Sequence, residues 1–371
     1  MIKSKFNQDL RRILIIVLIL LFAAVLPINA ELKVHFIDVG QGDAILIQEN
    51  QEYNVLIDGG NRWNSVEDKM ISYLEKNNVE KLDALISTHA HADHIGSLEA
   101  VIDNFKVEHV YDPGKIHTSK TFENYLIAVD KNNIPFETPR RNEEIIIGDL
   151  NFKVLHPVGD VEKYSLNNSS IVLKKKKKNI SFLFTGDIEK EVERDILNEN
   201  LPLNAAILKV AHHGSSTSSS KRFIDKVSPE TAVIQVGMDN KFGHPDKSTL
   251  QLLKEENINI LRNDLNGDIV INSDGNSYDI ETDKSISKKA NAKNNSSNDT
   301  SNNNSSDKNK ININTASASQ LESLWGVGPA TAKNIIKYRK NNNGFESIKE
   351  IKNVNGVGEA KFERWKEKIT L

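Results

Sequence analysis

The stretch Thr88-His89-Ala90-His91-Ala92-Asp93-His94 decides how the rest of this sequence is interpreted. It places three histidines and one carboxylate within six residues, in a chain that has only ten histidines. Imidazole and carboxylate together suit a borderline divalent ion such as zinc. Because alternate residues of a loop can project to one side, we expect His89 and His91 to share one ion and Asp93 and His94 to face a second.

The neighbouring sequence indicates that this loop is held by a sheet. An apolar run, residues 82–88, leads into it and predicts a buried strand. Further along, Asp187, the pair His212 and His213, and His244 each follow an apolar run, where a rigid sheet can hold metal ligands. A carboxylate at Asp187 could bridge two ions. Together with the first loop, these positions predict one metal centre.

Residues 31–283 have the pattern of a mixed α/β domain. Short apolar runs bounded by Gly or Asp indicate strands, and residues 66–77 have apolar side chains three or four positions apart, as in a helix. Hairpins alternate with single helices, which favours an α/β sandwich over a parallel doubly wound sheet.

The motif His89-x-His91-x-Asp93-His94 resembles the signature of the metallo-β-lactamase superfamily. Other segments resemble more closely the soluble C-terminal domain of the ComEC family of competence proteins: Asp38-Val39-Gly40-Gln41-Gly42-Asp43-Ala44, Leu56-Ile57-Asp58-Gly59-Gly60, Asn168-Ser169-Ser170-Ile171-Val172-Leu173, Thr185-Gly186-Asp187 and His212-His213-Gly214-Ser215. The resemblance implies a four-layer αββα sandwich with a dinuclear metal site at one edge of its two sheets. It also implies that Asp58 orients ligands and is not itself a ligand.

The sequence departs from the superfamily pattern at one place. Many members have a third histidine just before the strand that leads into the Asp187 motif, whereas this chain has Asn168, Ser169 and Ser170, as ComEC-like domains also do. The identity of two divalent ions therefore stays open between zinc and the harder manganese.

The sequence leaves open whether His212 or His213 is the metal ligand. We favour His213 for the metal and His212 for proton transfer or phosphate contact. The predicted metal ligands are His89, His91, Asp93, His94, Asp187, His213 and His244, and the predicted catalytic residues are Asp93, His212 and Asp58.

Five consecutive lysines, residues 174–178, stand between two apolar runs. We expect them at a hairpin tip, either as a solvated turn or as a finger that contacts phosphate beside the site.

The composition changes after residue 283. Residues 284–310 are dominated by Asn, Ser, Lys and Asp, which predicts a disordered tether. Residues 311–371 regain apolar periodicity and hold ten Lys or Arg against six Asp or Glu, so this second domain is basic. A basic domain is a weak indication of nucleic-acid binding.

Two matched glycine turns mark this second domain, each before a predicted helix. Glycines let the backbone turn tightly and present its N–H groups, and the positive end of the following helix adds to them, so that a phosphate is bound without any base being read. The domain resembles the small all-α helix-hairpin-helix domain of ComEA-type DNA receptors. The predicted DNA-binding residues are Gly326, Gly328, Lys333, Gly356, Gly358 and Lys361.

The N-terminus predicts export. Four basic residues precede an apolar run, residues 13–26, and Ala30 stands where a signal peptide could be cleaved. Residues 1–30 are therefore expected to be a signal peptide or a membrane anchor, which would leave the rest extracellular or anchored and facing outward. The cell membrane or envelope is then a further expected partner. The absence of cysteine excludes disulfides and thiolate metal ligands.

These features favour a metal-dependent hydrolase whose partner is DNA, most simply a nuclease that acts in DNA uptake or extracellular DNA degradation. Two divalent ions can activate water and stabilise charge on phosphorus. The alternatives are a hydrolase of another ester or lactam, since one fold hosts many chemistries, and a DNA-capture receptor with an idle hydrolase domain.

Overall fold

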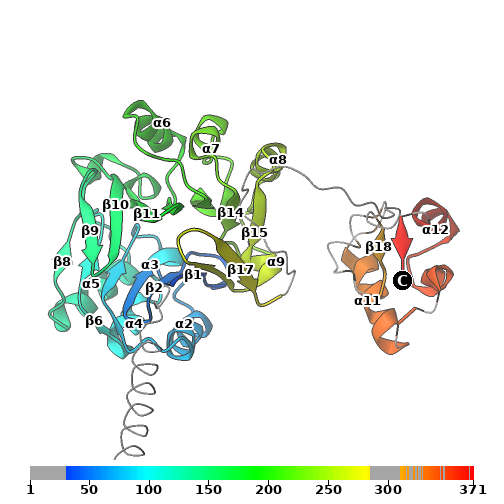
Figure 1. Ribbon diagram of the computed structural model, residues 1–371. Helices are drawn as coiled ribbons and strands as arrows, with labels where there is room; N and C mark the ends of the chain where they lie inside the picture. Colours follow the sequence, from blue (N-terminus) through cyan, green and yellow to red (C-terminus); the bar gives the residue numbers. More distant parts are fainter. Residues whose placement is uncertain are drawn as a thin grey trace, which may run out of the picture. The chain divides into compact units, whose positions relative to one another are not determined.

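The computed structural model describes residues 31–284, 310–314, 316, 321, 324, 327, 329–342, 344–345, 347–366 and 368–371. The chain divides into two compact units, Met1–Lys293 and Asn294–Leu371, which are described separately (Figure 1). The predicted signal segment, nearly all of the predicted tether, and Gly326 and Gly328 lie outside the described residues. Within the described part, none of the helices combines the length and the apolar character needed to span a membrane.

The first unit contains an eight-stranded mixed sheet. Its N-terminal strands form antiparallel hairpins, and its later strands β5, β7 and β8 join β3 in parallel. The order across this sheet is β17 (Tyr278–Thr282), β16 (Ile269–Ser273), β1 (Leu32–Phe36), β2 (Ile45–Glu49), β3 (Tyr53–Ile57), β5 (Ala84–Ile86), β7 (Val110–Tyr111) and β8 (Phe136–Glu137).

A seven-stranded mixed sheet lies against the first. The order across it is β15 (Asn259–Arg262), β14 (Thr231–Ile234), β13 (Ile207–Lys209), β12 (Ile180–Phe184), β11 (Val172–Lys177), β10 (Leu150–His156) and β9 (Glu144–Ile147). Strands β12 to β15 run parallel, so the residues that follow β12 and β13 emerge at the same edge. Two short strands, β4 (Lys81–Leu82) and β6 (Lys106–Val107), pair separately.

Three hydrophobic clusters define four layers. One fills the space between the two sheets and includes Phe36, Phe152 and Phe182. A second joins the first sheet to helices α2 (Asn64–Lys76), α4 (Leu98–Asn104) and α5 (Lys120–Lys131). The third joins the other sheet to α6 (Lys190–Asn198), α7 (Lys221–Val227) and α8 (Lys247–Glu255), which Figure 1 shows on the opposite side from α2 and α4. The predicted αββα sandwich is confirmed, and the helix predicted at residues 66–77 is α2.

The second unit is built mainly from α11 (Pro329–Asn341), a 3-10 segment (Ile348–Asn353) and α12 (Glu359–Trp365). Its core includes the fully buried Trp365 and Ile335. A short parallel pair, β18 (Ile311–Asn312) with β19 (Ile369–Thr370), ties the two ends of the domain together, which the all-α expectation did not include.

The position predicted for the lysine run is wrong. Lys174 to Lys177 belong to strand β11, and only Lys178 and Asn179 form the turn. The strand continues the alternation of the apolar Leu173, so Lys175 and Lys177 point inward, where both ammonium groups pair with the buried carboxylate of Glu49, at 3.2 and 2.9 Å. The lysines also lie at the wrong end of β11 to reach Asp187. Asp187 follows the C-terminal end of β12, which pairs with Leu173 at the start of β11, whereas Lys177 at the other end of β11 pairs with Ile180. The lysines are therefore structural, and not a finger beside the site.

Replacing Glu49 tests this ion-pair cluster. Glu49→Gln leaves two buried ammonium groups without a counter-charge, so we expect the free energy of unfolding to fall by about 3–5 kcal/mol. Chemical denaturation would measure the change, with the exposed Glu52→Gln as control. A loss as small as that of the control would mean that the lysines reach water in solution.

Candidate metal centre

The histidine-rich loop leaves β5 and runs into the short helix α3 (Ala92–Ile95). His89 and His94 are fully buried, and the His89 Nε2 and His91 Nδ1 atoms are 2.9 Å apart. Thr88 Oγ1 donates its proton to Asp58, so the contact of 3.1 Å with His89 Nδ1 requires that nitrogen to donate. The Nε2 atom of His89 therefore keeps its lone pair and faces His91 and the site.

Asp58 holds this loop in place. Its Oδ1 accepts from the Thr88 N–H at 2.7 Å, and its Oδ2 accepts from Thr88 Oγ1 at 2.7 Å and from His94 Nδ1 at 2.8 Å. Both oxygens are thereby occupied by protein groups. The geometry matches the orienting role that the resemblance implies, because a ligand imidazole fixed through Nδ1 presents Nε2.

The side chains of Asp93, His94, Asp187 and His213 converge at one place, but the Nε2 atoms of the two histidines form no hydrogen bond there. His94 Nε2 lies 3.3 Å from Asp187 Oδ2, and His213 Nε2 lies 3.4 Å from both Asp187 Oδ2 and Asp93 Oδ2. The Nδ1 atom of His213 is engaged with the Gln235 carbonyl at 2.9 Å. The Nε2 atoms of both histidines are buried without a hydrogen-bond partner. Two imidazoles and two carboxylates presented in this way fit a divalent cation.

His89, His94 and Asp187 form another group whose ligand atoms lie close enough to hold a metal ion. The first and last histidines of the loop motif thus approach the same carboxylate. The place of the missing third histidine is not filled by a substitute donor. Asn168 Oδ1 accepts from the Glu189 N–H, Ser169 Oγ donates to the Leu166 carbonyl, and Ser170 Oγ bridges the Asn167 carbonyl and the Asp187 N–H. These side chains organise the loop. Among the described residues, His91 lies next to His89 but does not join the groups that could hold a metal ion.

The two neighbouring histidines take different positions. His213 is buried within the groups just described, whereas His212 lies on the rim, 3.1 Å from Thr217 Oγ1 and near Glu189. Both residues have left-handed backbone, with φ of 51° and 52°. Such conformations are costly for residues with a Cβ and are typically kept at functional sites. The backbone turn thus directs one imidazole inward and the other toward solvent.

His244 does not join the metal-binding groups that the described residues form. Its ring lies 5.6 Å from that of His212, and its Nδ1 lies 3.7 Å from Asp246. The structure therefore places it on the rim beside His212.

Two residues of the centre were missed from the sequence. The Lys209 ammonium, at the end of β13, is fully buried, contacts Asp43 Oδ2 and lies 3.5 Å from Asp187 Oδ1. Asp43 lies 3.4 Å from His213 Nδ1 and groups with Asp187 and His213. A signal for Lys209 existed, since a lone lysine between Leu208 and Val210 in a buried strand has to be paired.

In the second unit, three of the described DNA-binding candidates form the second glycine turn or contact it, and the fourth, Lys333, lies on α11. Gly358 precedes α12 and is exposed, and Gly356 has φ of 94°, which favours glycine. The Lys361 ammonium donates to the Gly356 carbonyl at 2.8 Å, and Lys333 is exposed on α11. The turn is therefore open to solvent with a lysine beside it.

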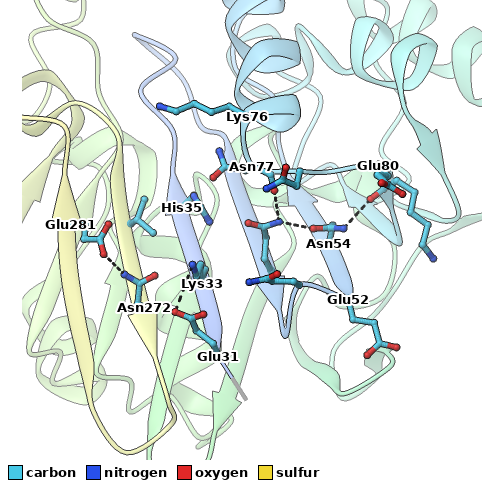
Figure 2. A pocket seen from close by; sticks show the side chains of 15 residues that line it. Glu31, Lys33, His35, Glu52, Asn54, Lys76, Asn77, Glu80, Asn272 and Glu281 are labelled. Atoms are coloured by element: carbon cyan, nitrogen blue, oxygen red, sulfur yellow. Dashed lines mark hydrogen bonds and ion pairs between the residues drawn. The ribbon is translucent and has the colours of Figure 1, made fainter. Parts of the chain in front are cut away.

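A polar cavity of about 590 Å³ lies away from the metal centre. It opens on the outer face of the first sheet, between the end of α2 and strands β1, β2 and β16, and contains acidic, basic and amide side chains (Figure 2). His35 at its floor is bonded to the Tyr73 hydroxyl at 3.0 Å, and burial lowers its pKa to about 4. No predicted site residue lines this cavity.

The fold and these groups define a metal-binding hydrolase. Residues 37–237 match the metallo-beta-lactamase superfamily, and residues 306–370 match the helix-hairpin-helix motif. The chain belongs to the metallo-beta-lactamase superfamily and carries a helix-hairpin-helix motif.

Curated relatives resemble each part. The chain is 36% identical over 257 residues to "ComE operon protein 3" of Bacillus subtilis, covering 65% of this chain and 33% of the relative. It is 26% identical to "Recombination protein 2" of Haemophilus influenzae, covering 65% and 29%. A segment of 61 residues is 46% identical to "ComE operon protein 1" of Bacillus subtilis, covering 16% and 30%. The chain thus spans about a third of the length of the relatives that it matches.

Metal binding should release protons. Burial alone would lower the pKa of His213, but the carboxylates of Asp187 and Asp43 raise it to about 10. Burial would also lower the pKa of His94, but the carboxylates of Asp187, Asp58 and Asp43 raise it well above its ordinary value. Both imidazoles are then protonated near neutral pH without metal, and a cation has to displace about two protons. The apparent affinity for zinc should therefore rise with pH.

Calorimetric titration of the metal-free protein in two buffers of different ionisation enthalpy would count these protons, and His213→Gln should release about one fewer. Equal heats in both buffers would contradict the expectation.

Proposed function

We propose that this protein is a metal-dependent nuclease that hydrolyses phosphodiester bonds of DNA. The observation that carries the proposal is the presence in one chain of a buried histidine and carboxylate centre and a helix-hairpin-helix motif. A hydrolase of a small ester or lactam would not need a helix-hairpin-helix motif, whereas a nuclease would use it to bind its substrate.

In this proposal the protein groups have separate roles. Asp93, His94, Asp187 and His213 would hold one divalent ion, His89 and His91 would contribute to holding a second, and the ions would be zinc or manganese. Two divalent ions in such a centre supply Lewis acidity toward phosphate oxygens and lower the pKa of water. Asp58 and the Gln235 carbonyl fix the ligand imidazoles. His212 on the rim contacts the phosphate or moves a proton to the leaving oxygen, and Asp93, partly exposed, borders the same space.

The second unit is proposed to capture DNA through phosphate. The backbone N–H groups at the two glycine turns, Gly326 with Gly328 and Gly356 with Gly358, bind phosphate oxygens, and Lys333 and Lys361 add positive charge. Such contacts read no base, so binding has little sequence preference and weakens as salt rises.

We further propose that residues 1–30 export the chain, which then acts outside the cytoplasm in DNA uptake or in degradation of extracellular DNA. The support is the basic and apolar pattern of the segment and the similarity to proteins named for competence. Cell fractionation that recovered the whole chain, with residues 1–30 intact, from the cytoplasm would contradict export.

Replacing the shared carboxylate separates cleavage from capture. Asp187→Ala should reduce DNA cleavage by at least about a hundredfold, because it removes a ligand of both ions, while DNA binding stays within about twofold. Labelled circular and linear DNA incubated with the protein and manganese or zinc would show cleavage, and a gel-shift assay would show binding. His91→Ala should behave in the same way.

Two outcomes would contradict this assignment. Full cleavage by metal-depleted Asp187→Ala protein would refute the centre, and hydrolysis of ester or lactam substrates with no cleavage of DNA would refute the substrate.

Deleting residues 311–371 tests the division of labour between the units. If the second unit only delivers DNA, the truncated protein should have a KM for DNA raised about tenfold or more, with kcat nearly unchanged, because effective concentration is lost and the centre is intact. Steady-state kinetics at low and saturating DNA would decide it. A large fall in kcat at unchanged DNA affinity would show that the second unit helps to build the active site.

A further inference from the structure

The loop between β14 and α8 carries two exposed apolar side chains and leads to His244, which lies beside His212. Within this loop Met238 is 65% exposed and Phe242 is 55% exposed. Single exposed apolar side chains are ordinary, but two in one short loop beside a polar site call for an explanation.

A row of aromatic rings connects Phe242 with the buried centre. The Phe242 and His244 rings are nearly parallel, at 14° and 6.0 Å between centroids. The His244 ring lies 5.6 Å from that of His212, which lies 6.2 Å from that of His213. The phenyl ring thus stands at the solvent end of a row that ends on a proposed metal ligand.

The loop is held in this shape by its own bonds. The Asn240 side chain donates to the Gly237 and His244 carbonyls, at 3.0 and 2.7 Å, and accepts from the His244 N–H at 3.1 Å. Gly237 packs so closely on Gln41 that a Cβ there would lie 2.5 Å from the Gln41 nitrogen. An exposed ring on a fixed loop loses little freedom when a ligand stacks on it, which favours binding.

A cation accompanies the ring. The Lys241 ammonium lies 5.1 Å from the centre of the Phe242 ring. The ammonium lies over the ring, and because the Lys241 side chain is long and exposed it can turn to a phosphate while a base stacks on the ring. A flat apolar ring with an ammonium group thus matches a nucleotide, which has a flat base and an anionic phosphate.

We propose that Phe242, with Lys241, forms a stacking subsite for an unpaired nucleobase of the DNA strand whose neighbouring phosphate lies at the metal centre. In a duplex each base is covered by its neighbours, so only a single strand or a frayed end can place a base on this ring. The subsite therefore selects single-stranded DNA. This inference rests on the proposed nuclease function and adds the form of its substrate.

Kinetics on three substrates tests the subsite: a single-stranded oligonucleotide, the same sequence as a duplex, and bis(p-nitrophenyl) phosphate, which has a phosphodiester and no base. Phe242→Ala should raise KM for the single strand about fivefold to a hundredfold, while Phe242→Trp keeps it, as expected for loss and retention of one stacking contact. Hydrolysis of the small diester should be unchanged. Phe136→Ala, which removes another exposed ring on β8, is the matched control and should change nothing.

A binding measurement gives a readout independent of cleavage. A single strand containing 2-aminopurine, mixed with the metal-free full-length protein, should show stacking of the fluorescent base that Phe242→Ala removes. DNA cleavage with unchanged KM and unchanged fluorescence in Phe242→Ala would overturn the subsite and leave the nuclease proposal standing. An equal loss on the small diester would also overturn it, since the ring would then be supporting the centre. If no DNA is cleaved at all, the nuclease proposal fails, and the fluorescence decides the subsite alone.

Discussion

The structure of the centre depends on the compensation of buried negative charge. Asp43, Asp58 and Asp187 all lie around the imidazole of His94 and are almost completely buried. A carboxylate removed from water is strongly destabilising unless it is paired. Here each has partners. Lys209 pairs with Asp43 and Asp187, the imidazole of His94 lies beside all three, and that of His213 lies beside Asp43 and Asp187. Bound cations would take over part of this compensation, so the metal-free protein holds protons where the loaded protein holds metal.

Local patterns in the sequence predicted most of the fold and the metal loop, but not every residue of the centre. The buried strand and the histidine-rich loop after it were predicted, because both are contained within a few residues, whereas the assignment of His89 and His91 to one ion stays a prediction. The lysine run was misplaced because its meaning depends on Glu49, which is more than a hundred positions away and on the other sheet. Asp43 and Lys209 each stood in a segment with a local signal, but neither segment names the partner, and only the packing of the two sheets brings the two residues together.

The comparisons describe a chain that combines two resemblances. Most of the hydrolase unit resembles one Bacillus subtilis protein, and a segment of 61 residues resembles another. In a single polypeptide the two units are always present in equal number, and an encounter between them is intramolecular. Under the proposed function, a DNA strand bound by the second unit would therefore reach the hydrolase unit without a second bimolecular step.

Ser170 limits how this centre can change by mutation. Its hydroxyl joins the Asn167 carbonyl to the Asp187 N–H, and its side chain lies where a Cβ on Gly186 would be 2.7 Å from its own. A histidine at this position would supply the absent third imidazole only by releasing the backbone of Asp187 and colliding with a turn that has no spare room. A change of ligand at this position therefore has to be accompanied by a change in the backbone of the turn, so the loop and the centre can change only together.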